Sequence, residues 1–245
     1  MRLIVASLFA AITALTATAC TPVEYDDELA TEDTTELSDA KADAAGTYTY
    51  YTVRPDFRRC ASPFCGGYWV ARVNRTTTRC GDGVYAESCY VADVDWSKLH
   101  TVAQTTATAE DAARAGTLLV RATVGLKDWG GPGKLGQLRP TEAWLGQGPN
   151  QPDGVFVKLE EIGTRCAAAP CPTFREQKLN GSGTAALAEL GWDASGIDDD
   201  RIGDAINQLF VNDLIIAGDR FTVHGPAGSG KARTVTQFYV RAINP

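Results

Sequence analysis

Two stretches of the chain, RCASPFCGGYWVARVN at residues 59–74 and RCAAAPCPTFREQKLN at residues 165–180, align without a gap. The alignment keeps both cysteines, the arginine before them and the final asparagine in register. Weaker matches follow in the same order: Trp96 with Trp192, LLV at 118–120 with LII at 214–216, and EAWL at 142–145 with QFYV at 237–240. Matches that recur in a fixed order are the signature of an internal repeat, so we predict that one unit occurs twice.

The repeat also predicts the fold class. Segments rich in aromatic and β-branched residues predict strands at 47–54, 67–74, 90–96, 117–126 and 138–145, and at 154–162, 173–180, 214–223 and 234–243. Helices are predicted at 108–116, capped by Thr108 and stopped by Gly116, and within 198–210. The shared order β-β-(β)-α-β-β predicts an α+β fold of two tandem copies with a mainly antiparallel sheet. We place the first repeat at 47–148 and the second at 149–245.

Six cysteines lie within the two repeats, and the repeat suggests how they pair. The second copy contains only Cys166 and Cys171, so the simplest disulfide joins them. Equivalence then gives a second disulfide between Cys60 and Cys65 and leaves a third between Cys80 and Cys89. Because a disulfide needs its two α-carbons within about 7 Å, each C-x4-C segment must form a tight turn. Zinc clusters favour other spacings and further ligands, so we predict no metal site.

The N-terminus predicts export from a bacterial cytoplasm. Arg2 precedes an apolar run that ends at Cys20, which is the pattern of a signal peptide covering residues 1–19. Residues 17–19 form an A-x-A cleavage site, and the same residues with Cys20 are similar to a lipobox, although Ala17 stands where leucine is usual. Lipidation of Cys20 leaves an even number of cysteines. We therefore predict a lipoprotein anchored in the outer membrane, with plain secretion as the alternative.

The segment that follows Cys20 predicts a tether. Residues 21–46 carry nine acidic residues and one lysine, and the whole chain has a formal charge of −7. Such a segment has too little apolar surface to fold, so we interpret residues 20–46 as a disordered acidic spacer. Because the acidity belongs to the spacer, residues 47–245 are close to neutral. They carry no basic stripe of the kind that binds nucleic acid.

The glycine-rich stretch HGPAGSGKART at 224–234 raises the question of nucleotide binding. Four residues separate Gly225 from Gly230 and Lys231, as in a phosphate-binding loop. That loop needs serine or threonine after the lysine and then a helix, whereas Ala232 and a segment of strand composition follow here. We predict a hairpin turn and no nucleotide or other cofactor.

Other residues that can carry chemistry lack partners in the sequence. His100 and His224 accompany no nucleophile at a recognisable spacing, so we assign no catalytic residue. The acidic run at 198–200 precedes a predicted helix, where carboxylates cap free amides, and is interpreted as a cap rather than a calcium site. Trp96 and Trp192 are equivalent and are expected in the core. Trp129, beside Gly130 and Gly131, is the better candidate for an exposed contact.

Several segments resemble one family. RPDFRRCASPFCGGYWVARVN at 54–74, with TRCGDG and CYVADVD behind it and RCAAAPCP and QFYV later, is similar to an uncharacterised family of myxobacterial lipoproteins that is classified as a domain of unknown function. The resemblance implies a location in the bacterial envelope. It implies no activity, ligand or catalytic residue.

Two hypotheses of function follow, with a third behind them. The first is a non-enzymatic envelope module that binds an unknown protein or glycan. The second is a protease inhibitor that presents a cysteine-clasped loop, ASPF at 61–64 or AAAP at 167–170, to an enzyme cleft. The third is a hydrolase with an unrecognised site.

Overall fold

The computed structural model describes residues 48–99, 103–211 and 213–242. The predicted signal peptide, Cys20, the acidic tether and His100 lie outside the described residues. One large, mainly antiparallel sheet, curled into a half-barrel, dominates the fold. Its strands are β1 (Thr49–Pro55), β2 (Tyr68–Arg72), β5 (Cys89–Val91), β6 (Asp93–Val94), β7 (Leu118–Asp128), β8 (Lys134–Gly146), β9 (Val155–Glu161), β10 (Phe174–Lys178), β11 (Thr184–Leu187), β13 (Leu214–Gly218) and β16 (Gln237–Arg241).

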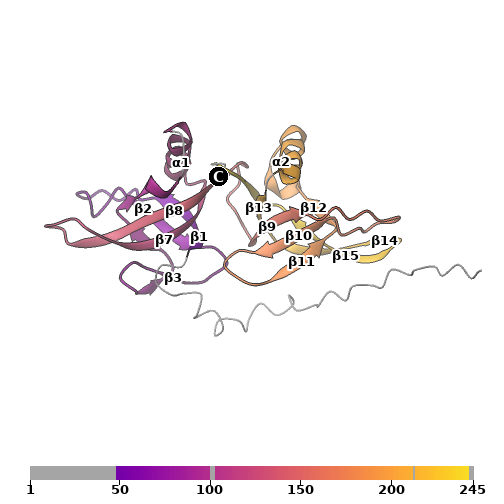
Figure 1. The fold of residues 1–245 in the computed structure, drawn as a ribbon, viewed down its shortest axis with the longest axis horizontal. Helices are drawn as coiled ribbons and strands as arrows, with labels where there is room; N and C mark the ends of the chain where they lie inside the picture. The colour runs from indigo at the N-terminus through magenta and orange to yellow at the C-terminus, as the bar shows by residue number, and fades with distance from the viewer. Residues whose placement is uncertain (1–47, 100–102, 212, 243–245) are drawn as a thin grey trace, which may run out of the picture.

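Smaller elements complete the described part of the chain. A three-stranded sheet contains β12 (Glu189–Gly191), β15 (Gly228–Thr234) and β14 (Arg220–Gly225), and a two-stranded ribbon contains β3 (Thr78–Arg79) and β4 (Tyr85–Ala86). The helices α1 (Ala103–Ala115) and α2 (Asp199–Val211) cover the same side of the large sheet (Figure 1). Short 3₁₀ turns, η3 (Trp96–Lys98) and η4 (Asp193–Ser195), precede them. Within the described ranges, neither helix is long and apolar enough to cross a membrane.

The prediction of an α+β fold made of two tandem units is wrong. The main path through the large sheet runs β11-β10-β9-β13-β16-β8-β7-β1-β2-β5, with β6 paired to β8 off this path. The sheet therefore crosses the expected boundary at 148–149 where β16 pairs with β8, with Tyr239 opposite Gly146 and Arg241 opposite Trp144. A sheet edge leaves backbone donors and acceptors unpaired. Joining the halves edge to edge satisfies both edges at once, which two separate units would not do.

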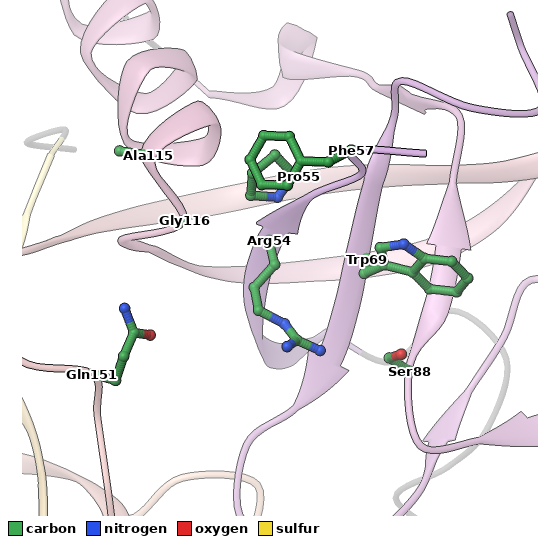
Figure 2. Close-up of a pocket in the computed structure, with 8 residues that line it drawn as sticks. All are labelled: Arg54, Pro55, Phe57, Trp69, Ser88, Ala115, Gly116 and Gln151. Atoms are coloured by element: carbon green, nitrogen blue, oxygen red, sulfur yellow. The ribbon is translucent and has the colours of Figure 1, made fainter. Parts of the chain in front are cut away.

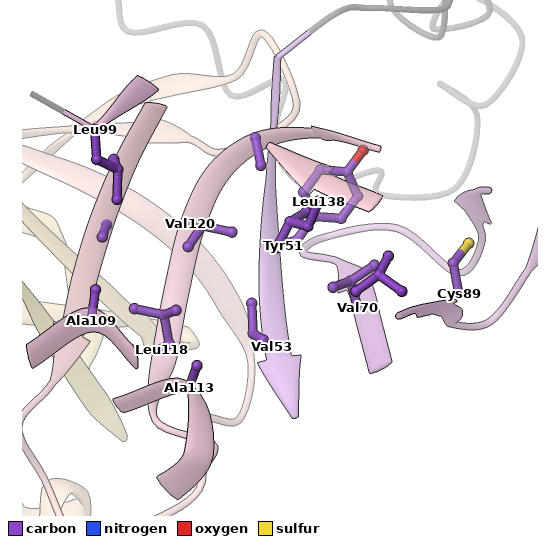
Figure 3. Packing of buried hydrophobic residues seen from close by; sticks show 13 residues of the cluster. Tyr51, Val53, Val70, Cys89, Leu99, Ala109, Ala113, Leu118, Val120 and Leu138 are labelled. Atoms are coloured by element: carbon purple, nitrogen blue, oxygen red, sulfur yellow. The ribbon is translucent and has the colours of Figure 1, made fainter. Parts of the chain in front are cut away.

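The core explains why the halves do not separate. Alternation along β7 sends Leu118 and Val120 to the side of α1 and sends Leu119 to the opposite face. On the opposite face Leu119 packs with residues from both halves into one cluster: Val73, Trp144, Phe156, Leu179, Ile215, Ala217 and Tyr239. The two remaining clusters lie under α1 (Figure 3) and under α2. Three apolar clusters thus share one sheet, and the cluster opposite the helices belongs to neither half alone.

The helix ends test the capping predictions. The Asp198 carboxylate accepts a hydrogen bond from the backbone N–H of Arg201 at 2.9 Å, so the predicted cap of α2 is confirmed. Gly116 follows α1 with a φ of +75°, as expected for the residue that stops a helix. Thr108 is not the cap, because α1 already begins at Ala103. Glu110 and Arg114 form an ion pair, 3.1 Å long, on the exposed side of α1.

Two asparagines form hydrogen bonds between the two halves of the chain. They lie at the seam, by which we mean the region where the two halves meet. The Asn74 side chain accepts from the N–H of Phe156 at 2.8 Å and donates to the carbonyls of Phe156 and Leu179 at 2.7 and 2.8 Å. Asn180 makes the equivalent contacts from the second half to the first. Its side chain accepts from the N–H of Tyr50 and donates to the carbonyls of Tyr50 and Val73, at 2.8 to 3.0 Å. Both residues have positive φ, 59° and 55°, which asparagine tolerates better than most residues. We name this pair the asparagine clasps.

Replacing Asn180 with alanine should destabilise the fold by about 3 kcal/mol, because three backbone groups lose partners and alanine is strained at positive φ. Urea unfolding of Asn180→Ala measures the loss. The control Asn207→Ala removes an exposed asparagine of α2 and should change the free energy of unfolding by far less. Equal losses in the two variants would show that the clasps contribute nothing specific.

Candidate functional site

Three disulfides are present, in the pairs that the repeat suggests. They join Cys60 to Cys65, Cys80 to Cys89, and Cys166 to Cys171, with α-carbons 5.5, 5.4 and 5.6 Å apart. The Cys60–Cys65 loop connects β1 to β2, and the Cys166–Cys171 loop connects β9 to β10. Their surroundings differ, which makes only one of them a candidate site.

The hairpin of β14 and β15 packs against one side of the Cys166–Cys171 loop, at Ala169 and Pro170, and leaves residues 166–169 exposed. The carbonyl of Ala169 accepts from the N–H of Ala227 at 2.9 Å. A Cβ on Gly225 would lie 2.5 Å from the Ala169 carbonyl oxygen, and one on Gly230 would lie 2.8 Å from Pro170. The glycines of the 224–234 stretch thus allow close packing of a hairpin on a loop. A hairpin turn does lie within this stretch, at residues 226–227, but residues 228–234 form strand β15 and not the predicted connection.

A buried ion cluster also ties this hairpin down. Glu176 of β10 is 1% exposed, and its carboxylate pairs with Arg220 of β14 and Arg233 of β15. A buried carboxylate requires such partners because it has left water. The second half therefore uses its cysteine loop and nearby charges for packing.

The Cys60–Cys65 loop rests instead on a group of side chains that contact one another. This group, which we name the platform, consists of Asp56, Arg58, Trp69 and Tyr90. The Asp56 carboxylate accepts two hydrogen bonds from Arg58 Nε, at 2.9 and 3.1 Å, and one from Nη2 at 3.0 Å. Trp69 Nε1 donates to the same carboxylate at 3.3 Å. The Arg58 guanidinium lies 4.9 Å from the Trp69 ring centre and 5.0 Å from that of Tyr90. Stacking on two rings and pairing with one carboxylate fixes this arginine.

The platform holds the loop by its backbone. Arg58 Nη2 donates to the carbonyl of Phe64 at 3.0 Å, and the Tyr90 hydroxyl donates to the carbonyl of Pro63 at 2.8 Å. The N–H of Phe64 donates to the carbonyl of Ala61, which closes a turn inside the disulfide. The loop is therefore fixed by hydrogen bonds at Pro63 and Phe64 as well as by the disulfide.

Large apolar side chains on this platform are exposed. Phe57 is 84% exposed and Phe64 is 50% exposed. Beside Phe57 a pocket of about 500 Å³ opens between β1, β2 and the end of α1, lined by Arg54, Pro55, Phe57, Trp69, Ser88, Ala115, Gly116 and Gln151 (Figure 2). We name the group of Arg54, Phe57, Phe64 and Trp69 the clasp surface. It combines aromatic rings with an exposed arginine on a rigid base, which is the composition of binding hot spots.

A second pocket, of about 620 Å³, lies near the asparagine clasps. Its centre is Glu142, which accepts from Tyr50 at 3.3 Å and pairs with Arg121 at 3.1 Å. Trp144 Nε1 donates to Glu142 at 3.2 Å. Burial, and then the adjacent Glu142 carboxylate, raise the pKa of the Tyr50 hydroxyl well above its usual range. Glu142 is thus engaged in structural contacts at the seam.

The structure shows how far the three tryptophans with a predicted location are buried. Trp96 packs against the cluster under α1 and Trp192 against the cluster under α2, so both core predictions are confirmed. Trp129 lies at the connection of β7 and β8, partly exposed, with Lys127 Nζ 4.7 Å from its ring centre. Its indole nitrogen has no hydrogen-bond partner among the described residues. His224 contacts Ser229, with 2.9 Å between Nδ1 and Oγ.

Sequence reasoning missed the clasp surface, although a signal was present. The segment RPDFRR at 54–59 looks like a charged, solvated loop. Its single carboxylate, Asp56, lies two residues from Arg58 and is 7% exposed. A carboxylate with arginines on both sides, next to a disulfide loop, indicates a local ion pair. If Asp56 and Arg58 turn toward each other, the side chain of Phe57 between them is left exposed to solvent.

These features define a disulfide-bonded, β-rich protein that works outside the cytoplasm, because disulfides persist in oxidising compartments. Residues 49–245 match the family described as Domain of unknown function (DUF6748), and the chain belongs to this family. No curated protein and no solved structure matches the chain.

The ion pair between Asp56 and Arg58 should affect how the free energy of unfolding depends on pH under acidic conditions. Hydrogen bonds from Arg58 are the main cause that lowers the pKa of Asp56 to about 2, against about 3.9 for a free aspartate. A lowered pKa stabilises the fold above about pH 4, and this stabilisation is lost as the pH falls toward 2. The free energy of unfolding should therefore fall less steeply in this window for Asp56→Asn than for the natural protein.

Urea unfolding at several pH values measures the two slopes. The control Asp204→Asn removes an exposed carboxylate of α2 and should keep the natural slope. A slope for Asp56→Asn that matches the natural protein would contradict the ion pair.

Proposed function

We propose that this protein is a non-enzymatic lipoprotein of the bacterial envelope that binds a protein partner through the clasp surface. The observation that carries the proposal is Phe57, which is 84% exposed on a loop fixed by a disulfide and an ion pair. A large apolar side chain held rigidly in water gains free energy when a partner covers it. Rigidity lowers the ordering cost of that binding.

The composition of the surface favours a protein over a glycan. Sugar sites combine a flat ring with free polar groups that fix the hydroxyls. Asp56, the carboxylate beneath the rings, is buried and already bonded to Arg58 and Trp69. The two most exposed rings, Phe57 and Phe64, carry no polar atom. Aromatic rings with an arginine rim match the centre of a protein interface.

Protease inhibition by the same loop has less support. An inhibitory loop offers an extended backbone to the enzyme, whereas the N–H of Phe64 donates to Ala61 and its carbonyl accepts from Arg58. The Cys166–Cys171 loop exposes only small side chains, at residues 166–169, and the β14–β15 hairpin packs against Ala169 and Pro170. Exposed Phe64 remains the one feature in favour of this second function.

The anchor at Cys20 completes the proposal. The disulfides agree with export, and Cys20 is the one cysteine of the chain outside the three pairs. A lipid on Cys20 would account for it. The acidic segment 21–46 would then separate the sheet from the membrane.

Phe57 is the position at which a partner should be trapped. A photo-crosslinking phenylalanine analogue at position 57, in the bacterium that makes the protein, should yield one discrete adduct. The same analogue at Phe210, a 59% exposed residue of α2, is the matched control and should not yield it.

The purified partner then measures the energy of the contact. Phe57→Ser should weaken its binding by about thirtyfold, a hot-spot loss of about 2 kcal/mol, and Phe210→Ser should leave it unchanged. No adduct at position 57, or the same adduct from both positions, would overturn the proposal.

Cys20→Ser should abolish attachment of the lipid. Labelled palmitate fed to the cells should enter the natural protein and not the variant, because the acyl chains need the cysteine. The natural protein would be recovered with the outer membrane. Label in Cys20→Ser, or none in the natural protein, would exclude the anchor while leaving the clasp surface untested by that result.

A further inference from the structure

Strand β14 forms an open edge at the end of the molecule that is remote from α1 (Figure 1). Among the described strands it pairs only with β15, from Arg220 opposite Arg233 to Gly225 opposite Gly228. Phe221 is 39% exposed, and Thr222 and His224 are exposed as well. Its outer backbone groups therefore have no partner strand within the described ranges.

The ladder shows which groups point outward. The N–H of Thr234 donates to the carbonyl of Asp219 at 2.9 Å, so Asp219 bonds to β15. Antiparallel ladders alternate bonded and non-bonded pairs. Phe221, Val223 and Gly225 therefore bond to β15 as Asp219 does. The N–H and carbonyl groups of Arg220, Thr222 and His224 point away from β15.

This edge lacks the usual protection against pairing. Natural edge strands carry lysine, proline or bulges that discourage other strands. Residues 221–225 are Phe, Thr, Val, His and Gly, with neither a lysine nor a carboxylate, and the charge of Arg220 is paired with Glu176. The ends of the large sheet are shorter: β5 has three residues and β11 has four.

We propose that β14 is a dimerisation edge, which pairs antiparallel with β14 of a second copy of the chain. The two-fold axis passes through Thr222, so Thr222 faces its own counterpart and Arg220 faces the partner's His224. This register places all the outward groups in bonded pairs and gives about six hydrogen bonds, because each bonded pair exchanges two. Phe221 then lies opposite the partner's Val223, an aromatic and β-branched pair that stabilises sheets.

A second copy fits this edge better than an unrelated peptide. A two-fold contact brings identical residues together, so it requires an edge that does not repel itself, and residues 221–225 meet this condition. Recognition of an extended peptide needs pockets for alternate side chains. No β14 residue lines either of the two pockets described above. The edge is also separate from the clasp surface, so either proposal can fail without the other.

Sedimentation of the exported chain, residues 20–245 with Cys20→Ser so that no lipid is attached, tests the dimer. The natural chain should reach twice the mass of one chain as its concentration rises. Thr222→Pro should remain at the mass of one chain, because proline removes an outward N–H that β15 does not use. Thr222→Lys should do the same through repulsion across the axis. The matched control Thr184→Lys adds the charge to the exposed edge of β11 and should still dimerise.

Hydrogen exchange adds a readout of the register. The amides of Thr222 and His224 should become protected as dimer forms, and circular dichroism should show that each variant is folded. A natural chain that stays monomeric at every concentration would overturn the proposal. A dimer that persists in both Thr222→Pro and Thr222→Lys, or one that leaves these amides unprotected, would overturn it as well.

Discussion

The continuity of the sheet depends on a small set of polar contacts at the seam. Asn74 and Asn180 each reach across it and satisfy both the N–H and the carbonyl of a residue in the other half. Strand pairing alone joins the halves through β8 and β16, over only a few residues. The clasps fix the approach of β1 and β9, which places Phe156, Tyr239 and Leu119 in one apolar cluster. Without that approach the buried cluster would open to water.

The same cysteine loop serves different purposes in the two halves. In the second half a hairpin packs against it, and the glycines of that hairpin make room for Ala169 and Pro170. In the first half it stands on the pairing of Asp56 with Arg58 and leaves Phe57 in water. One copy of a local structure thus anchors a hairpin, and the other carries exposed aromatic side chains. This difference, more than the presence of the loops, identifies the candidate site.

Local features could be predicted from the sequence, and long-range ones could not. The disulfide partners, the Asp198 cap and the hairpin at 224–234 depend on residues close in the chain, where spacing and turn chemistry are informative. The pairing of β8 with β16 joins residues far apart, and alternation tells which face a residue takes but not which strand it meets. The α+β prediction failed for this reason. The clasp surface was missed because Asp56 and Arg58 resemble solvated charges until their contacts are known.

The position of β1 has a mechanical consequence. β1 is an interior strand, bonded to β2 on one side and to β7 on the other, and it is the first strand of the described chain. A pull on the chain ahead of Tyr48 that is directed along β1 therefore acts across two rows of hydrogen bonds at once. Force applied in this direction shears all of those bonds together, whereas a pull on an edge strand would peel them one by one. The described chain thus enters the fold through a strand that is hydrogen-bonded on both sides.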